Sequence, residues 1–182
     1  MNELEKKGQM VARAIAFATK AHEGQFRKGT KRPYIVHPLE VGEIVATLTF
    51  DEEIISAALL HDTIEDCQGI TREVLAQESE DKSKTWFERK SHTIEHLKYA
   101  PYEVRMIGLA DKLSNIRDID RDYPIMGEEL WNRFRMKEKN MIGWYYKGLR
   151  ESLREGFEQE EAFREYSYLV DKNFGIDDSS HI

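Results

Sequence analysis

The chain has 182 residues and a formal net charge of −7, from 27 Lys plus Arg and 34 Asp plus Glu. This length suits one domain with a self-sufficient core, and a hydrophobic content of 40% excludes wholesale disorder. The single cysteine, Cys67, excludes an intramolecular disulfide and a cysteine-rich zinc site, and it fits a reducing compartment. The acidic balance argues against general nucleic-acid binding but leaves room for a local basic pocket.

Membrane and export signals are missing from the sequence. No apolar run approaches the roughly 18 residues that span a bilayer, and the first ten residues lack the apolar core of a signal peptide. We therefore expect a soluble, cytoplasmic protein without a membrane or nucleic-acid partner. The sequence does not define the oligomeric state.

The apolar pattern predicts helices along the chain. Val11–Ala18 has apolar residues at i, i+3, i+4 and i+7, which is typical of a helix. After a loop over Gly24–Val36, Pro38 suits the first position of a second helix. The nearly all-apolar stretch Ile54–Leu60 predicts a buried third helix. Further helices are expected at Thr71–Leu75, Trp86–Leu97, Val104–Ile116, Leu130–Leu153 (long and amphipathic) and Phe163–Val170.

No segment shows the alternation of a strand, and the sequence contains no repeat. The predicted class is therefore all-α. We expect a single domain over residues 1–176, followed by a polar tail at residues 177–182.

A histidine and three carboxylates follow the apolar third helix. His61 and Glu65 are four residues apart, as are Asp62 and Asp66, so each pair shares one face if the helix continues. Because buried carboxylates are usually paired or bound to metal, this favours a metal at His61 and Asp62, with Glu65 and Asp66 directed at water or substrate. A helix end with solvated acids is the alternative, and this stretch alone does not decide between them.

Two further stretches carry polar residues in apolar surroundings. Asp111 stands in an apolar helix with Asn115 four residues later, although both are also compatible with ordinary core residues satisfied by the backbone. His37 precedes Pro38 at a helix start and is either a structural residue or a ligand. Together with His61 and Asp62 they form a nitrogen–oxygen ligand set without thiolate, which suits Mn²⁺, Fe²⁺, Co²⁺ or Zn²⁺. Such a site predicts hydrolysis of a phosphate ester or anhydride.

The loop before His37 is basic within an acidic protein. Arginine pairs with phosphate and stacks on bases, and Tyr34 adds an aromatic ring. We favour phosphate recognition over a merely solvated basic turn because the loop directly precedes a candidate ligand. Its glycines match neither a P-loop nor a dinucleotide fingerprint. The four cations are Arg27, Lys28, Lys31 and Arg32.

The ordered motifs resemble one family. They are AHEGQ at residues 21–25, RK at 27–28, PYIVHP at 33–38, LLHDTIED at 59–66 and LADKLSNIR at 109–117. The set is similar to the HD superfamily of metal-dependent phosphohydrolases, and more narrowly to the hydrolase domain of the RelA/SpoT homologues. The resemblance is greatest to the stand-alone small alarmone hydrolases.

This resemblance implies an HD-type helical bundle with a central metal site. It also implies removal of the 3′-pyrophosphate from ppGpp or pppGpp, the alarmones of the stringent response, to give GDP or GTP plus pyrophosphate. No organic cofactor is implied, and we expect no synthetase domain in a chain of this length. The implied residue roles are Mn²⁺ binding by His37, His61, Asp62 and Asp111; action on the attacking water by Glu65 and Asp66; guanine stacking by Arg27; phosphate binding by Lys28; and nucleotide contacts by Tyr34 and Asn115.

The chain departs from the family pattern at two places. The segment between Arg27 and Tyr34 is one residue longer than in the long bifunctional relatives, and residues 71–82 are about a dozen residues shorter than the family suggests, which a fold can tolerate. Two alternatives therefore stay open: an HD phosphohydrolase acting on another nucleotide, such as an NADPH phosphatase or a nucleotidase, and a non-catalytic nucleotide sensor.

Overall fold

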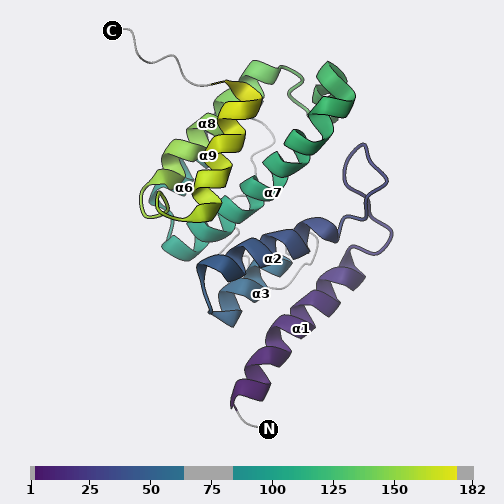
Figure 1. Cartoon of the computed structure of the whole chain (residues 1–182), viewed down its shortest axis with the longest axis vertical. Coiled ribbons are helices and arrows are strands. Elements are labelled where there is room, and N and C mark those ends of the chain that lie inside the picture. Colours follow the sequence, from purple (N-terminus) through teal and green to yellow (C-terminus); the bar gives the residue numbers. More distant parts are fainter. Residues whose placement is uncertain (1–2, 64–83, 176–182) are drawn as a thin grey trace. The chain divides into compact units, whose positions relative to one another are not determined.

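The computed structural model describes residues 3–63 and 84–175 (Figure 1). These residues form helices joined by turns, with one isolated antiparallel bridge between Phe26 and Pro33, so the prediction of an all-α fold is confirmed. The chain forms two compact units, Met1–Lys82 and Ser83–Ile182. The single domain predicted over residues 1–176 stays a prediction. The short helix expected at 71–75 and the tail at 177–182 lie outside the described residues.

Unit 1 (Met1–Lys82) contains three described helices. Helix α3 packs against both other helices. Close contact between α2 and α3 depends on Gly42, because a Cβ atom there would lie 2.7 Å from the Leu59 side chain. The helices are α1 (Glu3–Ala21), α2 (Val36–Leu48) and α3 (Glu52–Leu60). Their core holds Ala14, Ala18, Val41, Val45, Ala58 and Leu59.

Two helix ends in unit 1 set the positions of the site residues. Helix α2 begins at Val36, two residues before the predicted start, and Pro38 fits its first turn because N–H groups there have no intrahelical acceptor. Helix α3 is capped by Asp51, which accepts a hydrogen bond of 2.9 Å from the backbone of Glu53. It ends at Leu60, so His61 and Asp62 lie in a turn and not on the continuous helix that their spacing predicted.

Unit 2 (Ser83–Ile182) contains four described α-helices and a 3₁₀-helix. A reciprocal capping box of Thr85 and Glu88 starts the first helix. The long second helix packs against the last, and α8 packs against α6 and α9. The elements are α6 (Trp86–Tyr99), α7 (Tyr102–Met126), η2 (Gly127–Arg133), α8 (Lys139–Arg154) and α9 (Glu161–Phe174). Fully buried side chains include Leu109, Leu113, Ile116, Leu149, Leu153, Phe157, Tyr166 and Val170.

The single long helix predicted at Leu130–Leu153 is wrong. Gly127 takes a positive φ of 57° and ends α7, and the chain continues as the 3₁₀-helix η2. Trp131 is buried there, and its indole N–H donates to Glu128 at 3.0 Å. Extended backbone at Phe134 then separates η2 from α8. The apolar spacing around Trp131 therefore reflects packing of a short 3₁₀-helix.

No helix within residues 3–63 and 84–175 combines the length and apolar character that crossing a membrane requires.

The α2–α3 contact gives a first prediction. Gly42→Val should lower the free energy of unfolding by about 2 kcal/mol, because the new side chain overlaps Leu59 in a packed core. Urea unfolding followed by circular dichroism measures the change. Ala46→Val on the same helix is the control, because Ala46 is exposed and surface changes stay within about 0.5 kcal/mol. Equal effects of the two substitutions would contradict a packing role for Gly42.

Candidate metal centre

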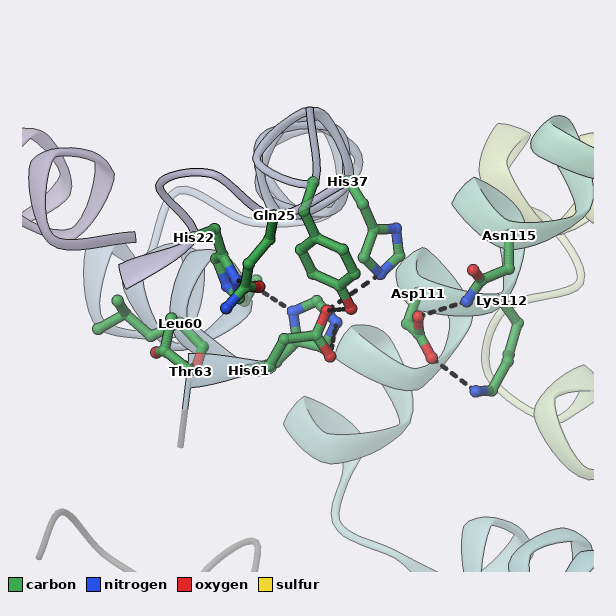
Figure 2. A network of polar contacts seen from close by, with 12 residues as sticks. His22, Gln25, His37, Leu60, His61, Thr63, Asp111, Lys112 and Asn115 are labelled. Carbon is green, nitrogen blue, oxygen red and sulfur yellow. Dashed lines mark hydrogen bonds and ion pairs between the residues drawn. The ribbon is translucent and has the colours of Figure 1, made fainter. Parts of the chain in front are cut away.

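Three of the predicted ligands come together in unit 1. His37 is the second residue of α2 and only 3% exposed, while His61 and Asp62 directly follow α3. The imidazole rings of His37 and His61 have centroids 5.2 Å apart. Asp62 is shared between them: its Oδ2 lies 3.5 Å from His37 Nε2, and its Oδ1 lies 3.2 Å from His61 Nε2. Figure 2 shows the two histidines with their ring nitrogens.

The tautomer of His61 follows from a backbone contact. Its Nδ1 lies 2.8 Å from the carbonyl oxygen of Ala58 and donates to it, because a carbonyl only accepts. In the neutral ring, Nε2 then presents a lone pair toward the Asp62 carboxylate. Two acceptors at 3.2 Å repel each other unless a cation or a proton lies between them. Metal-binding histidines are typically oriented by such an Nδ1–H to carbonyl bond. This donor set therefore fits a divalent metal ion.

Tyr34 is hydrogen-bonded to the carboxylate of Asp62. Its hydroxyl donates a hydrogen bond of 2.7 Å to Asp62 Oδ2, across 28 positions of sequence. The ring of His22 packs on the Tyr34 ring with centroids 4.7 Å apart. The family resemblance predicts a nucleotide contact for Tyr34 and no role for His22. The only signal for His22 was its place in the AHEGQ motif.

The basic loop forms a tight hairpin-like turn. Backbone N–H groups of Arg27 and Tyr34 donate to the carbonyls of Arg32 and Gln25, each at 2.9 Å. Gly29 allows the reversal with a positive φ of 71°. The turn holds the Arg27 guanidinium 5.5 Å from the centroid of the Tyr34 ring. Arg27 thus lies beside the candidate centre, and Lys28, the predicted phosphate ligand, has an exposed side chain.

In unit 2, Asp111 lies on α7 and pairs with two neighbours on the same helix (Figure 2). Asn115 donates to its Oδ1 at 2.7 Å, and Lys112 donates to its Oδ2 at 2.6 Å. Burial is the largest single influence on Lys112 and lowers its pKa, but the charge and hydrogen bond of Asp111, together with Tyr145 and Tyr146, outweigh it, so the pKa lies well above its ordinary value. The predicted nucleotide contact Asn115 is therefore also a partner of Asp111.

Glu65 and Asp66, the residues expected to act on the attacking water, lie outside the described residues. Their roles stay predictions.

Comparison with known proteins defines the class. Residues 14–82 match the HD domain family, and this range includes His37, His61 and Asp62. The fold resembles a solved structure of a metazoan orthologue of SpoT that hydrolyses ppGpp and plays a role in starvation responses. That match has a TM-score of 0.72 and 23% identity over 92% of this chain and 97% of the other. The chain is an HD domain protein.

Closer relatives define the family. The MESH1 guanosine-3′,5′-bis(diphosphate) 3′-pyrophosphohydrolase of Xenopus tropicalis is 34% identical over 144 residues, which are 71% of this chain and 78% of the relative. The crystal structure of lmo0812 from Listeria monocytogenes EGD-e matches with a TM-score of 0.66 and 31% identity, over 77% of this chain and 99% of the other. The chain belongs to the MESH1 family.

The ion pair of Asp111 gives a second prediction. In EDTA, Lys112→Met should lower the free energy of unfolding by about 2 kcal/mol, because it removes the cation beside the half-buried carboxylate of Asp111; fully buried pairs lose roughly 3–5 kcal/mol. The matched control is Lys172→Met, which removes the exposed pair to Asp120 at 2.8 Å and should cost at most about 1 kcal/mol.

The pH dependence of this effect has a defined sign. Because folding raises the pKa of Lys112, the stabilisation is fully present below the unfolded lysine pKa of about 10.4 and is lost as the pH rises through the folded value. From neutral pH up to about pH 9, the difference between wild type and Lys112→Met should therefore be constant. A difference that disappears toward neutral pH would contradict the ion pair as its source.

Proposed function

We propose that this protein is a metal-dependent hydrolase that removes the 3′-pyrophosphate of ppGpp and pppGpp, giving GDP or GTP and pyrophosphate. The observation that carries the proposal is the Asp62 carboxylate placed against the Nε2 atoms of His37 and His61, an arrangement that suits a divalent cation. The substrate follows from family membership, since the MESH1 relatives are named for this activity.

We propose that four residues hold the metal: His37, His61, Asp62 and, from unit 2, Asp111. Two imidazoles and two carboxylates suit Mn²⁺ and also accept other divalent transition metals. A bound ion of this kind lowers the pKa of water and polarises a phosphate. The Nδ1–H bond of His61 to Ala58 supports the proposal, because it fixes the ring with Nε2 available as a ligand.

The remaining roles concern water and substrate. Glu65 and Asp66 would orient the attacking water, and a carboxylate there would accept its proton as the water oxygen bonds to phosphorus. The ribose 3′-oxygen would leave at the same time and take up a proton to become the 3′-hydroxyl of GDP or GTP. Arg27 would stack on the guanine and Lys28 would bind phosphate. The exposed side chain of Lys28 on the hairpin supports an encounter with an anionic ligand. Tyr34 and Asn115 would contact the nucleotide.

We further propose that the protein acts in the cytoplasm on this small nucleotide. The single cysteine, Cys67, supports a reducing compartment. The net charge of −7 supports the absence of a nucleic-acid partner.

The activity is tested directly. Protein stripped with EDTA should release GDP and pyrophosphate from ppGpp only after Mn²⁺ is added, because the bound metal would lower the pKa of the attacking water and polarise the phosphate. Separation of nucleotides by anion exchange, with an assay for pyrophosphate, measures both products. Release of single phosphate, or hydrolysis of NADPH in place of ppGpp, would contradict the alarmone activity and favour a phosphatase.

Two substitutions separate metal binding from water activation. Asp62→Asn should weaken Mn²⁺ binding at least tenfold and abolish turnover, because it removes the charge shared by the two histidines. Glu65→Gln should leave Mn²⁺ bound and lower kcat by roughly 10²- to 10⁴-fold, as expected for a group that accepts a proton. Calorimetric titration and steady-state kinetics measure the two effects.

Asp51→Asn is the matched control, because asparagine is also a good N-cap and the same charge is removed at the other end of α3. It should leave both metal binding and turnover unchanged. Loss of the metal in Glu65→Gln would instead make Glu65 a ligand and contradict its proposed role.

A further inference from the structure

The hydroxyl of Tyr34 is directed at a candidate metal ligand and not at open solvent. It donates to Asp62 Oδ2 at 2.7 Å, and the carboxylate is 26% exposed. A hydrogen bond from a phenol to an ionised carboxylate is among the strong ones, because the acceptor is charged. The contact therefore restrains the rotation of the Asp62 side chain.

This restraint orients both carboxylate oxygens. With Oδ2 held by Tyr34, Oδ1 faces His61 Nε2 at 3.2 Å. Aspartate otherwise rotates about its side-chain bonds, and ordering it on binding costs entropy. A carboxylate that the fold has already oriented binds a metal ion more tightly, because its side chain loses no further rotational freedom on binding.

His22 supports the ring of Tyr34 from the end of α1. It is 5% exposed, and the two rings are inclined by 34° with centroids 4.7 Å apart. Its Nδ1 lies 2.8 Å from Oε1 of Gln25, so the ring donates to the same residue whose backbone carbonyl accepts from Tyr34 (Figure 2). Histidine and tyrosine are thus tied to one another through Gln25 as well as through their rings.

The second nitrogen of His22 is the unusual part of this arrangement. Nε2 is buried and has no hydrogen-bond partner among the residues that the structure describes. Buried polar atoms are nearly always paired, so an exception calls for a reason. A histidine is suited to this position despite its unpaired nitrogen, because the imidazole both packs against Tyr34 and donates through Nδ1–H to Gln25.

We infer that Tyr34 and His22 are positioning residues of the metal centre: Tyr34 holds Asp62 through its hydroxyl, and His22 holds the ring of Tyr34. The inference rests on the proposed metal site but not on the nucleotide substrate. It differs from the nucleotide contact proposed for Tyr34, since a positioning role acts through Asp62 and is present before any nucleotide binds.

The test is Tyr34→Phe in the full chain. This substitution removes only the hydroxyl and retains the ring against His22 and Arg27. Mn²⁺ is titrated into EDTA-stripped protein without nucleotide, and free Mn²⁺ is measured by electron paramagnetic resonance. The Kd for Mn²⁺ should rise roughly 10- to 100-fold, the loss typical when a group that orients a metal ligand is removed.

The control removes the same atom elsewhere. Tyr168→Phe changes a 63% exposed tyrosine on α9 and should leave the Kd unchanged. Steady-state kinetics over a series of Mn²⁺ concentrations add a second readout. For a positioning role, the Mn²⁺ concentration that half-activates the enzyme rises in Tyr34→Phe. If the KM for ppGpp rises while the Kd for Mn²⁺ stays at the wild-type value, Tyr34 contacts only the substrate and the inference is overturned.

Two substitutions of His22 test the second half. His22→Ala removes the ring that packs against Tyr34. It should raise the Kd for Mn²⁺, though less than Tyr34→Phe does. His22→Phe keeps a flat ring but removes the bond to Gln25 together with the unpaired nitrogen, so it should restore only the part of the affinity that depends on the ring contact. An unchanged Kd in His22→Ala, with circular dichroism showing an intact fold, would remove His22 from the arrangement.

The outcomes separate this inference from the proposed function. Wild-type protein that binds neither Mn²⁺ nor another divalent ion overturns both. Wild-type protein that binds Mn²⁺ but leaves ppGpp intact overturns the proposed substrate only, and the comparison with Tyr34→Phe still decides the positioning role.

Discussion

The Asp62 carboxylate, shared by two imidazoles, is the interaction on which the rest of unit 1 depends. Its oxygens lie 3.5 Å from His37 Nε2 and 3.2 Å from His61 Nε2, and one of them also accepts from Tyr34. The Nδ1–H group of His61 donates a hydrogen bond to the backbone carbonyl of Ala58, and Nε2 of the same ring therefore faces Asp62. The cluster thus gathers nitrogen and carboxylate groups of the kind that bind divalent metal ions, and the local chain holds them in this arrangement.

Helix ends achieve this placement. Helix α2 begins just before His37, and α3 stops just before His61, so one histidine lies in the first turn of a helix and the other in the turn that follows a helix. Close packing of α2 on α3 at Gly42 brings these ends together. The hairpin of residues 25–34 then returns Tyr34 to the carboxylate. Helix packing, helix ends and the hairpin turn therefore together position the side chains of the candidate metal centre.

The sequence was informative where polar residues interrupt apolar helices. His61 and Asp62 stood out for that reason, and the structure joins them to His37 as expected. The hydrogen bond of Tyr34 was not predictable, because it spans 28 residues and depends on how the hairpin folds back. The helix expected at Leu130–Leu153 failed because apolar spacing alone does not reveal that Gly127 ends α7 and a 3₁₀-helix follows.

The end of α3 has an electrostatic consequence of its own. Peptide dipoles aligned along a helix place a partial negative charge, equivalent to about half an electron, at its C-terminus. Helix α3 ends at Leu60, immediately before His61 and Asp62, so this charge adds to that of the carboxylate. The backbone itself therefore attracts a cation to this turn. That attraction is confined to the last turn of the helix and persists whatever side chain occupies position 62.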